Sequence, residues 1–332
     1  MQVRLLPTNL GAIAVLSLLC SSPVLAAGPS TITVDGSSTV YPITEAVAEE
    51  FQQKNKTRVT VGIAGTGGGF KRLCAGETDI ANASRPISKE EMAACKAKGI
   101  AYYELPMAFD ALTVVVNPKN TWATTMTVAE LKKLWEPSAQ GKITKWSQLR
   151  AGWPDQPIKL YGPGADSGTF DYFTEAVVGK AKSSRGDYTA SEDDNTLVQG
   201  VSRDPNALGY FGYAYYIPHQ SMIKAVGIDG GKGAVMPSKE TVINSTYSPL
   251  ARPLFIYVSD KAAKRPEVAS FVKFYLESAP QLVSEVKYVP LPSASYTTVL
   301  SRFNTGQVGT GFAGEALAGM HIDDILKRNP VN

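Results

Sequence analysis

Three stretches of the chain combine glycine with serine or threonine, each between an expected strand and an expected helix. They read DGSSTVYP (35–42), GTGGGFKR (65–72) and GADSGTFDYF (164–173). The start of a helix offers unpaired backbone N–H groups and about half a positive charge, and nearby hydroxyls add further donors. Such a junction can hold an anion. Taken alone, however, each stretch is also typical of an ordinary helix cap.

These stretches do not fit the common catalytic and nucleotide-binding motifs. Phe70 stands where a dinucleotide-binding fingerprint needs glycine, and GADSGT lacks the lysine of a nucleotide P-loop. Ala165 and Thr169 replace the glycines that flank a hydrolase nucleophile. Only His219 and His321 are present, too few to indicate a catalytic triad or a metal site. We therefore expect a binding site without catalysis, cofactor or metal.

A fourth stretch, NASRPIS (82–88), places Ser84 and Arg85 in a turn before Pro86. The planar guanidinium of arginine offers a fork of donors to an oxyanion. An ordinary surface ion pair is the alternative role for Arg85.

The order of the expected elements predicts an α/β fold in two parts. Apolar strands alternate with amphipathic helices from residue 31, which favours a largely parallel sheet. The strand at 252–260 and the helix after it are more similar to the elements of the first part than to those of the second. We therefore predict a first lobe of residues 28–117 and 250–332 and a second lobe of residues 118–249, joined by two crossings that form a hinge.

Composition is ordinary for a globular protein. The chain has 332 residues, of which 44% are hydrophobic and 19% are charged. The formal net charge of +3 is too small to argue for a nucleic-acid or membrane-surface partner.

The first 27 residues predict export. Arg4 precedes an apolar stretch that ends in small residues at Ala26 and Ala27, the pattern of a cleaved signal peptide. A membrane anchor is one alternative. Another is lipidation of Cys20, although Leu19 stands where such signals carry a small residue.

Export also bears on the two remaining cysteines, Cys74 and Cys95. An even pair in an oxidising compartment predicts a disulfide. It would join the helix after GTGGG to the next helix. Two buried thiols are the alternative.

Taken together, these stretches resemble the periplasmic phosphate-binding protein of the Pst phosphate ABC transporter, and cyanobacterial members most. The resemblance rests on DGSSTVYPI, GTGGGFKRLCAGETDIANASRPIS, DSGTFDYF, ITKWSQL and LGYFGYAYY, in the order of that family. It implies a type II periplasmic-binding-protein fold, with two α/β lobes on a two-strand hinge that close on phosphate. It also implies a periplasmic monomer that delivers phosphate to a membrane permease and binds no nucleic acid.

The resemblance assigns hydroxyl and N–H donors to phosphate, namely those of Ser38, Thr39, Thr66, Ser167, Gly168 and Thr169. Two positions depart from the family pattern. Arg85 stands where the family has an aspartate that accepts the proton of phosphate, and Pro163 stands where it has an arginine. The positive charge is therefore expected at Arg85. Our first candidate for the acceptor is Asp166, which could instead be a helix cap, and our second is Asp110.

Two other functions remain open at this point. A receptor for another tetrahedral oxyanion, such as sulfate or molybdate, would use the same donors. A secreted phosphate-ester hydrolase would need a base or a metal beside Ser167, and the sequence offers no ligand cluster there.

Overall fold

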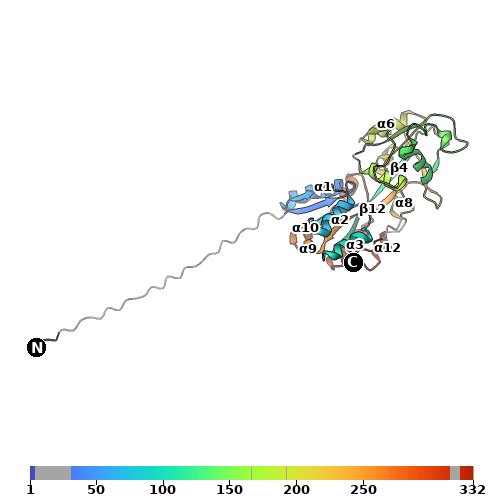
Figure 1. The fold of residues 1–332 in the computed structure, drawn as a ribbon. Helices are drawn as coiled ribbons and strands as arrows, with labels where there is room; N and C mark the ends of the chain where they lie inside the picture. The colour runs from blue at the N-terminus through green and yellow to red at the C-terminus, as the bar shows by residue number, and fades with distance from the viewer. Residues whose placement is uncertain (4–30, 166, 192, 315–321, 332) are drawn as a thin grey trace.

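The computed structural model describes residues 1–3, 31–165, 167–191, 193–314 and 322–331. They form two α/β lobes, with strand β12 (Ala251–Ser259) passing from the junction into the first lobe (Figure 1). Residues 4–27 of the predicted signal peptide and the candidate acceptor Asp166 lie outside the described residues. No described helix combines the length and the apolar character that crossing a bilayer would need.

The first lobe is built on three parallel strands with helices packed around them. Its strands are β1 (Ile32–Gly36), β2 (Val59–Val61) and β3 (Ile80–Ala83), and its helices are α1 (Tyr41–Asn55), α2 (Thr66–Ala75), α3 (Lys89–Ala97), α9 (Asp260–Ala263), α10 (Pro266–Glu285), α11 (Ser293–Asn304) and α12 (Ile322–Leu326). Helix α1 buries Ile43, Val47 and Phe51, which share one face because they are four residues apart. Phe51 meets Phe271 of α10 edge to face at 5.2 Å, so the first and the returning parts of the chain share one core.

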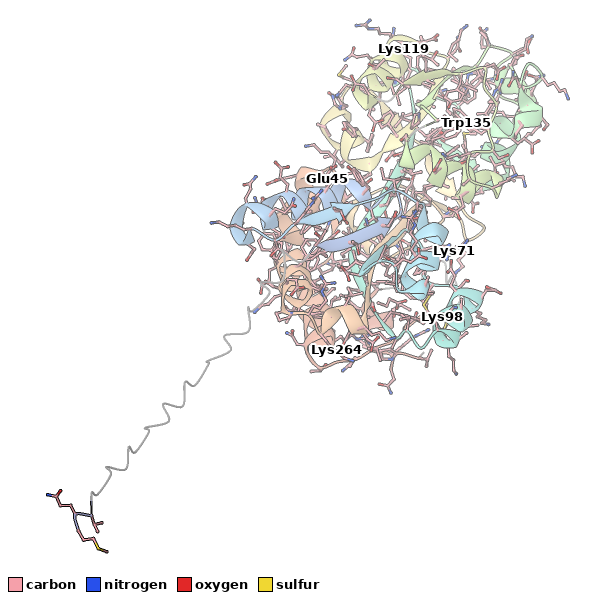
Figure 2. The ribbon with its side chains drawn as sticks, turned by 60° about the vertical axis from the view of Figure 1, so that its left-hand side comes forward. Glu45, Lys71, Lys98, Lys119, Trp135 and Lys264 are labelled. Atoms are coloured by element: carbon pink, nitrogen blue, oxygen red, sulfur yellow. A yellow bond between two sulfur atoms is a disulfide. The ribbon has the colours of Figure 1, made fainter. Side chains whose placement is uncertain are left out.

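The second lobe repeats this plan around a core of aromatic residues. Trp135 lies in its interior (Figure 2), and the Phe173 and Tyr210 rings stack at 3.7 Å. The main strands are β6 (Lys159–Pro163), β7 (Thr189–Ser191) and β8 (Ala207–Gly212), all parallel. A smaller sheet joins β5 (Thr125–Thr127), β10 (Gly227–Asp229) and β11 (Ala234–Val235). The helices are α4 (Val128–Trp135), α5 (Gly168–Phe173), α6 (Asp194–Arg203), α7 (Tyr213–Tyr216) and α8 (Lys239–Ile243), with a π-helical turn at Thr174–Val178 and short 3-10 turns at Pro137–Ala139, Trp146–Gln148 and Ile217–His219.

Two antiparallel strands join the lobes. Strand β4 (Tyr102–Val116) pairs with β12 as far as Ala111 and with β8 from Leu112 onward. The main path of the sheet is β2–β1–β3–β12–β4–β8–β6–β7, and the short strands β9 (Lys224–Ala225) and β13 (Val289–Pro290) also pair with β4. The expected parallel pairing holds among β1, β2 and β3 and among β6, β7 and β8. It fails at this centre, because the chain leaves through β4 and returns through β12 in the opposite direction.

The limits of the lobes, 28–117 with 250–332 and 118–249, stay a prediction. The first limit follows the end of β4 at Val116, and β4 changes partner between Ala111 and Leu112. At the second crossing, the N–H of Leu112 donates to the carbonyl of Leu250 at 2.9 Å. The two crossings thus lie side by side, and side chains near them can reach both lobes.

The predicted disulfide is confirmed. Cys74 of α2 and Cys95 of α3 are bonded, with sulfurs 1.98 Å apart. Both cysteines are buried in a small core that includes Phe70 and Ile87. The bond fixes α3 against α2, close to the turn that carries Arg85.

Candidate functional site

The loop between β1 and α1 presents donors that the helix itself does not use. Thr39 is buried and Ser38 is half-buried, and α1 starts without a side-chain cap. None of the backbone N–H groups of residues 38–40 donates a hydrogen bond to another described residue. Because N–H groups at the start of a helix need a cap, water or ligand, this loop is suited to an anion.

The start of α2 places Thr66 against Ser84 at the end of β3. Thr66 Oγ1 lies 3.1 Å from Ser84 Oγ and accepts from the N–H of Ser84 at 3.2 Å. Gly65 precedes the helix with a φ of 77°, a conformation that favours glycine. A Cβ on Gly69 would lie 2.7 Å from Cα of Gly36. The glycines therefore let α2 approach the end of β1. This approach places Thr66, the first residue of α2, beside that end of the strand.

The start of α5 combines a helix cap with a contact between the lobes. Ser167 caps the helix by accepting from the N–H of Thr169 at 3.2 Å, so the ordinary cap role applies to this hydroxyl. A Cβ on Gly168 would lie 3.0 Å from Thr39 Oγ1 and 3.1 Å from Thr39 Cα. The second lobe thus reaches the β1–α1 loop of the first lobe at a residue that has no side chain.

Arg85 follows β3, as expected, but its guanidinium is already paired. Its two terminal nitrogens donate to the two carboxylate oxygens of Glu91 in α3 at 2.9 and 2.8 Å, and one of them also donates to the carbonyl of Pro86. The guanidinium lies 5.5 Å from the centre of the Phe70 ring. Hydrogen bonding to Glu91 raises the pKa of Arg85, and the negative charge of Glu175 in the second lobe adds to that rise.

A second arginine, Arg252, lies where the lobes meet, and the sequence reasoning did not consider it. Its side chain is 14% exposed. Nη2 donates to Thr39 Oγ1 at 3.3 Å, and the guanidinium lies 3.5 Å above the Tyr172 ring of α5. Two carboxylates lie 3.6 Å away, that of Asp110 from Nε and that of Glu175 from Nη1. Arg252 therefore touches residues of both lobes.

Asp110 is the partner of Arg252 across the hinge strands. The two residues face each other in the register of β4 and β12. Burial raises the pKa of Asp110 to about 6, and the nearby Arg252 opposes that rise. Asp110 Oδ2 is buried without a hydrogen-bond partner among the described residues, whereas Glu104, the other buried acid of β4, accepts from the hydroxyl of Tyr257 at 2.6 Å. A buried acceptor without a donor suits a ligand that carries a proton.

The structure assembles the predicted residues in two groups. Thr39 and Gly168 meet beside Arg252, and Thr66 meets Ser84 beside Arg85. No hydrogen bond links these groups within the part of the chain that the structure describes. Ser38 lies in the β1–α1 loop with Thr39, Ser167 and Thr169 flank Gly168 at the start of α5, and Asp166 lies outside the described residues.

The sequence did not indicate Arg252 as a site residue, because RPLFIYVSD (252–260) has the pattern of an apolar strand. The signal available was a charged residue at the start of a strand that carries the chain back between the lobes. Asp110 is likewise a charged residue within an otherwise mostly apolar strand, β4. Only the register of the two strands shows that these residues are neighbours.

Comparison with known proteins finds relatives of this chain that are named as phosphate-binding proteins. Residues 23–279 match the model of the PBP superfamily domain. The chain is 55% identical over 321 residues to protein SphX of Synechococcus elongatus, covering 96% of this chain and 95% of that protein. It is 38% identical over 271 residues to the phosphate-binding protein PstS of Staphylococcus epidermidis, covering 80% of each chain.

Solved structures agree with these relatives. A crystal structure from Planctomyces limnophilus, described as a "possible phosphate binding protein", superposes with a TM-score of 0.81 at 55% identity. It covers 83% of this chain and 98% of that one. An ABC-type phosphate transport receptor from Vibrio cholerae gives a TM-score of 0.60 at 26% identity over 79% of this chain and all of that one.

Proposed function

The chain belongs to the family of the SphX and PstS phosphate-binding proteins within the PBP superfamily, and from this premise we propose that it binds inorganic phosphate between its lobes. It then delivers the ion to the membrane permease of an ABC transporter. Members of this family are transport receptors. The protein therefore acts by holding and releasing an ion, without changing it chemically.

The observation that carries this proposal is the meeting of Thr39, Gly168 and Arg252. A hydroxyl-bearing loop of one lobe lies against a helix start of the other, beside a buried positive charge. A buried oxyanion needs many donors and a compensating charge, and this junction supplies both.

The donors assigned to phosphate are compatible with their structural roles. The hydroxyl of Ser167 accepts the cap bond from Thr169 N–H and still has its own O–H to donate. Thr66 Oγ1 accepts from the Ser84 N–H, and its own O–H can donate to phosphate when the Ser84 hydroxyl is the donor in their 3.1 Å contact. We assign Ser38, Thr39, Thr66, Ser167, Gly168 and Thr169 as donors to phosphate, with Arg85 at the edge of the site.

Selectivity for phosphate needs an acceptor as well. Phosphate near neutral pH usually carries a proton, while sulfate carries none. A buried carboxylate accepts a hydrogen bond from the protonated oxygen of phosphate but meets sulfate with lone pair against lone pair, and a site of this kind can reject the wrong ion about 10⁴-fold. Asp110 now has the stronger physical case because it is buried beside Arg252 with an unpaired oxygen. Asp166, which lies outside the described residues, is the other candidate.

The place of action follows from the predicted signal peptide. We place the mature protein in the periplasm, as a monomer that meets the permease through its outer surface. The oxidised Cys74–Cys95 pair supports an exported protein because disulfides persist mainly outside the cytosol.

Calorimetry with a small panel of anions tests the proposal. The mature protein should bind phosphate tightly, at a ratio of one to one, and should bind sulfate and molybdate far more weakly. Tighter binding of sulfate or molybdate would favour the receptor for another oxyanion. In parallel, release of chromophore from a chromogenic phosphate ester would favour the hydrolase.

A further inference from the structure

The hydrogen bonds of Arg252 differ from those of the other half-buried or buried arginines that form close ion pairs. Arg85, Arg150 and Arg185 each direct two nitrogens at one carboxylate, and Arg265 directs one nitrogen at Asp79 and another at Glu267, all with distances between 2.6 and 2.9 Å. Arg252 has two carboxylates nearby, both at 3.6 Å and both beyond hydrogen-bond distance. Its Nε is buried with no hydrogen-bond partner among the described residues. The donors of this guanidinium are therefore largely unused.

The two carboxylates also differ from each other. The Asp110 side chain is 6% exposed and held in the sheet, whereas the Glu175 side chain is 52% exposed and lies in the π-helical turn after α5. With both ionised, the cluster carries one excess negative charge, which would oppose an incoming anion. Only Glu175 can turn into water at low cost, because Asp110 is enclosed by the hinge strands.

We propose that Arg252 binds the oxyanion directly and exchanges Glu175 for it. This inference rests on the proposed function and adds a residue that selects and holds the ion. The anion takes the Nη1 donor that now faces Glu175, together with the Nη2 donor that points toward Thr39, and Glu175 moves away into solvent. Tyr172 keeps the guanidinium in place, since its ring lies against Arg252 while its hydroxyl donates to the carbonyl of Pro249 at 2.7 Å. One buried arginine thus connects the loop of the first lobe, the hinge and the helix start of the second.

Calorimetry with phosphate on substituted mature protein tests this exchange. Arg252→Gln should weaken phosphate binding about a hundredfold, because a buried charge-assisted contact is lost. The same change in an Asp110→Asn background removes the complication of an unpaired buried carboxylate and should again cost about a hundredfold. Arg203→Gln, at an exposed arginine at the end of α6, is the matched control and should leave the affinity unchanged.

Glu175→Gln gives an independent readout at a half-exposed position where folding is not at risk. It should tighten phosphate binding about threefold to tenfold, because the ion no longer competes with a carboxylate. An unchanged or weaker affinity in Glu175→Gln would overturn the exchange. A loss below about threefold for Arg252→Gln in the Asp110→Asn background would overturn the contact. If the unsubstituted protein failed to bind phosphate, the proposed function itself would be wrong.

Discussion

Arg85 and Arg252 both lie near the junction of the lobes, and they are held in opposite ways. Arg85 has both terminal nitrogens on Glu91 within the first lobe, so its charge is neutralised and its donors are engaged. Arg252 sits between two lobes and two carboxylates without a close bond to either. An arginine with close ion pairs shapes its surroundings, whereas a buried arginine with only loose ones is costly unless a ligand uses its donors.

This contrast moves the expected charge of the site from a turn to the hinge. The sequence pointed to Arg85 because it takes the place of a family aspartate. The structure shows that Arg85 is fixed to α3 through Glu91, which also accepts from the N–H of Ser88 in the cap of that helix. The negative charge of Glu175 acts on both arginines, because it raises the pKa of Arg85 and lies 3.6 Å from Arg252.

The largest effect should come from Asp110, the proposed acceptor beside Arg252. Asp110→Asn should lower the preference for phosphate over sulfate by at least about a hundredfold, because the amide can turn a donor toward sulfate. Asp166→Asn is the matched variant, two residues before Gly168 in the sequence. The measurement is the ratio of the two dissociation constants by calorimetry. A ratio that falls only in Asp166→Asn would assign the acceptor role to that residue instead.

The pH dependence of sulfate binding sharpens this test. The pKa of Asp110 is about 6, so its carboxyl is ionised at pH 8 and mostly protonated at pH 5. Arg252 on β12, Tyr172 on α5 and Tyr288 are the charged or titratable groups that act on it. A protonated carboxyl can donate to sulfate, so sulfate should bind more tightly as the pH falls through about 6. The Asp110→Asn variant should lack this dependence.

An intermediate effect should reveal the indirect role of Arg85. Arg85→Gln should weaken phosphate binding about tenfold, because it leaves the charge of Glu91 unpaired near the anion. Arg85→Gln combined with Glu91→Gln should restore the affinity to within about threefold, and the new glutamine side chain can keep the cap of α3. A loss of a hundredfold in both variants would show that Arg85 binds the anion directly, as the sequence suggested.

The smallest effect concerns the contact between the lobes. Gly168→Ala would bring a methyl group to 3.0 Å from Thr39 Oγ1, so the loops must move apart by a few tenths of an ångström. We expect phosphate binding to weaken about threefold to tenfold with little change in the melting temperature. Gly186→Ala is the control, since its nearest atom would lie at 3.5 Å. Equal affinities for the two variants would mean that the lobes separate more widely around the bound ion.

The sequence predicted the repeating plan of the lobes and the three helix starts, because glycine, hydroxyl and apolar spacing are local signals. It also paired Cys74 with Cys95, since only two cysteines remained after export. It did not predict the antiparallel centre of the sheet or the neighbours of Arg252. Those depend on the register between β4 and β12, whose paired residues Asp110 and Arg252 are far apart in the chain. Whether an arginine forms a close ion pair likewise depends on which carboxylates the tertiary fold brings near it.

The most direct test compares the two arginines in one experiment. Phosphate dissociation constants are measured by calorimetry for the native protein, for Arg252→Gln, and for Arg85→Gln combined with Glu91→Gln. The account predicts a loss of about a hundredfold in Arg252→Gln and an affinity within about threefold of native in the double variant. The reverse ranking, with near-native binding in Arg252→Gln and a hundredfold loss in the double variant, would contradict it.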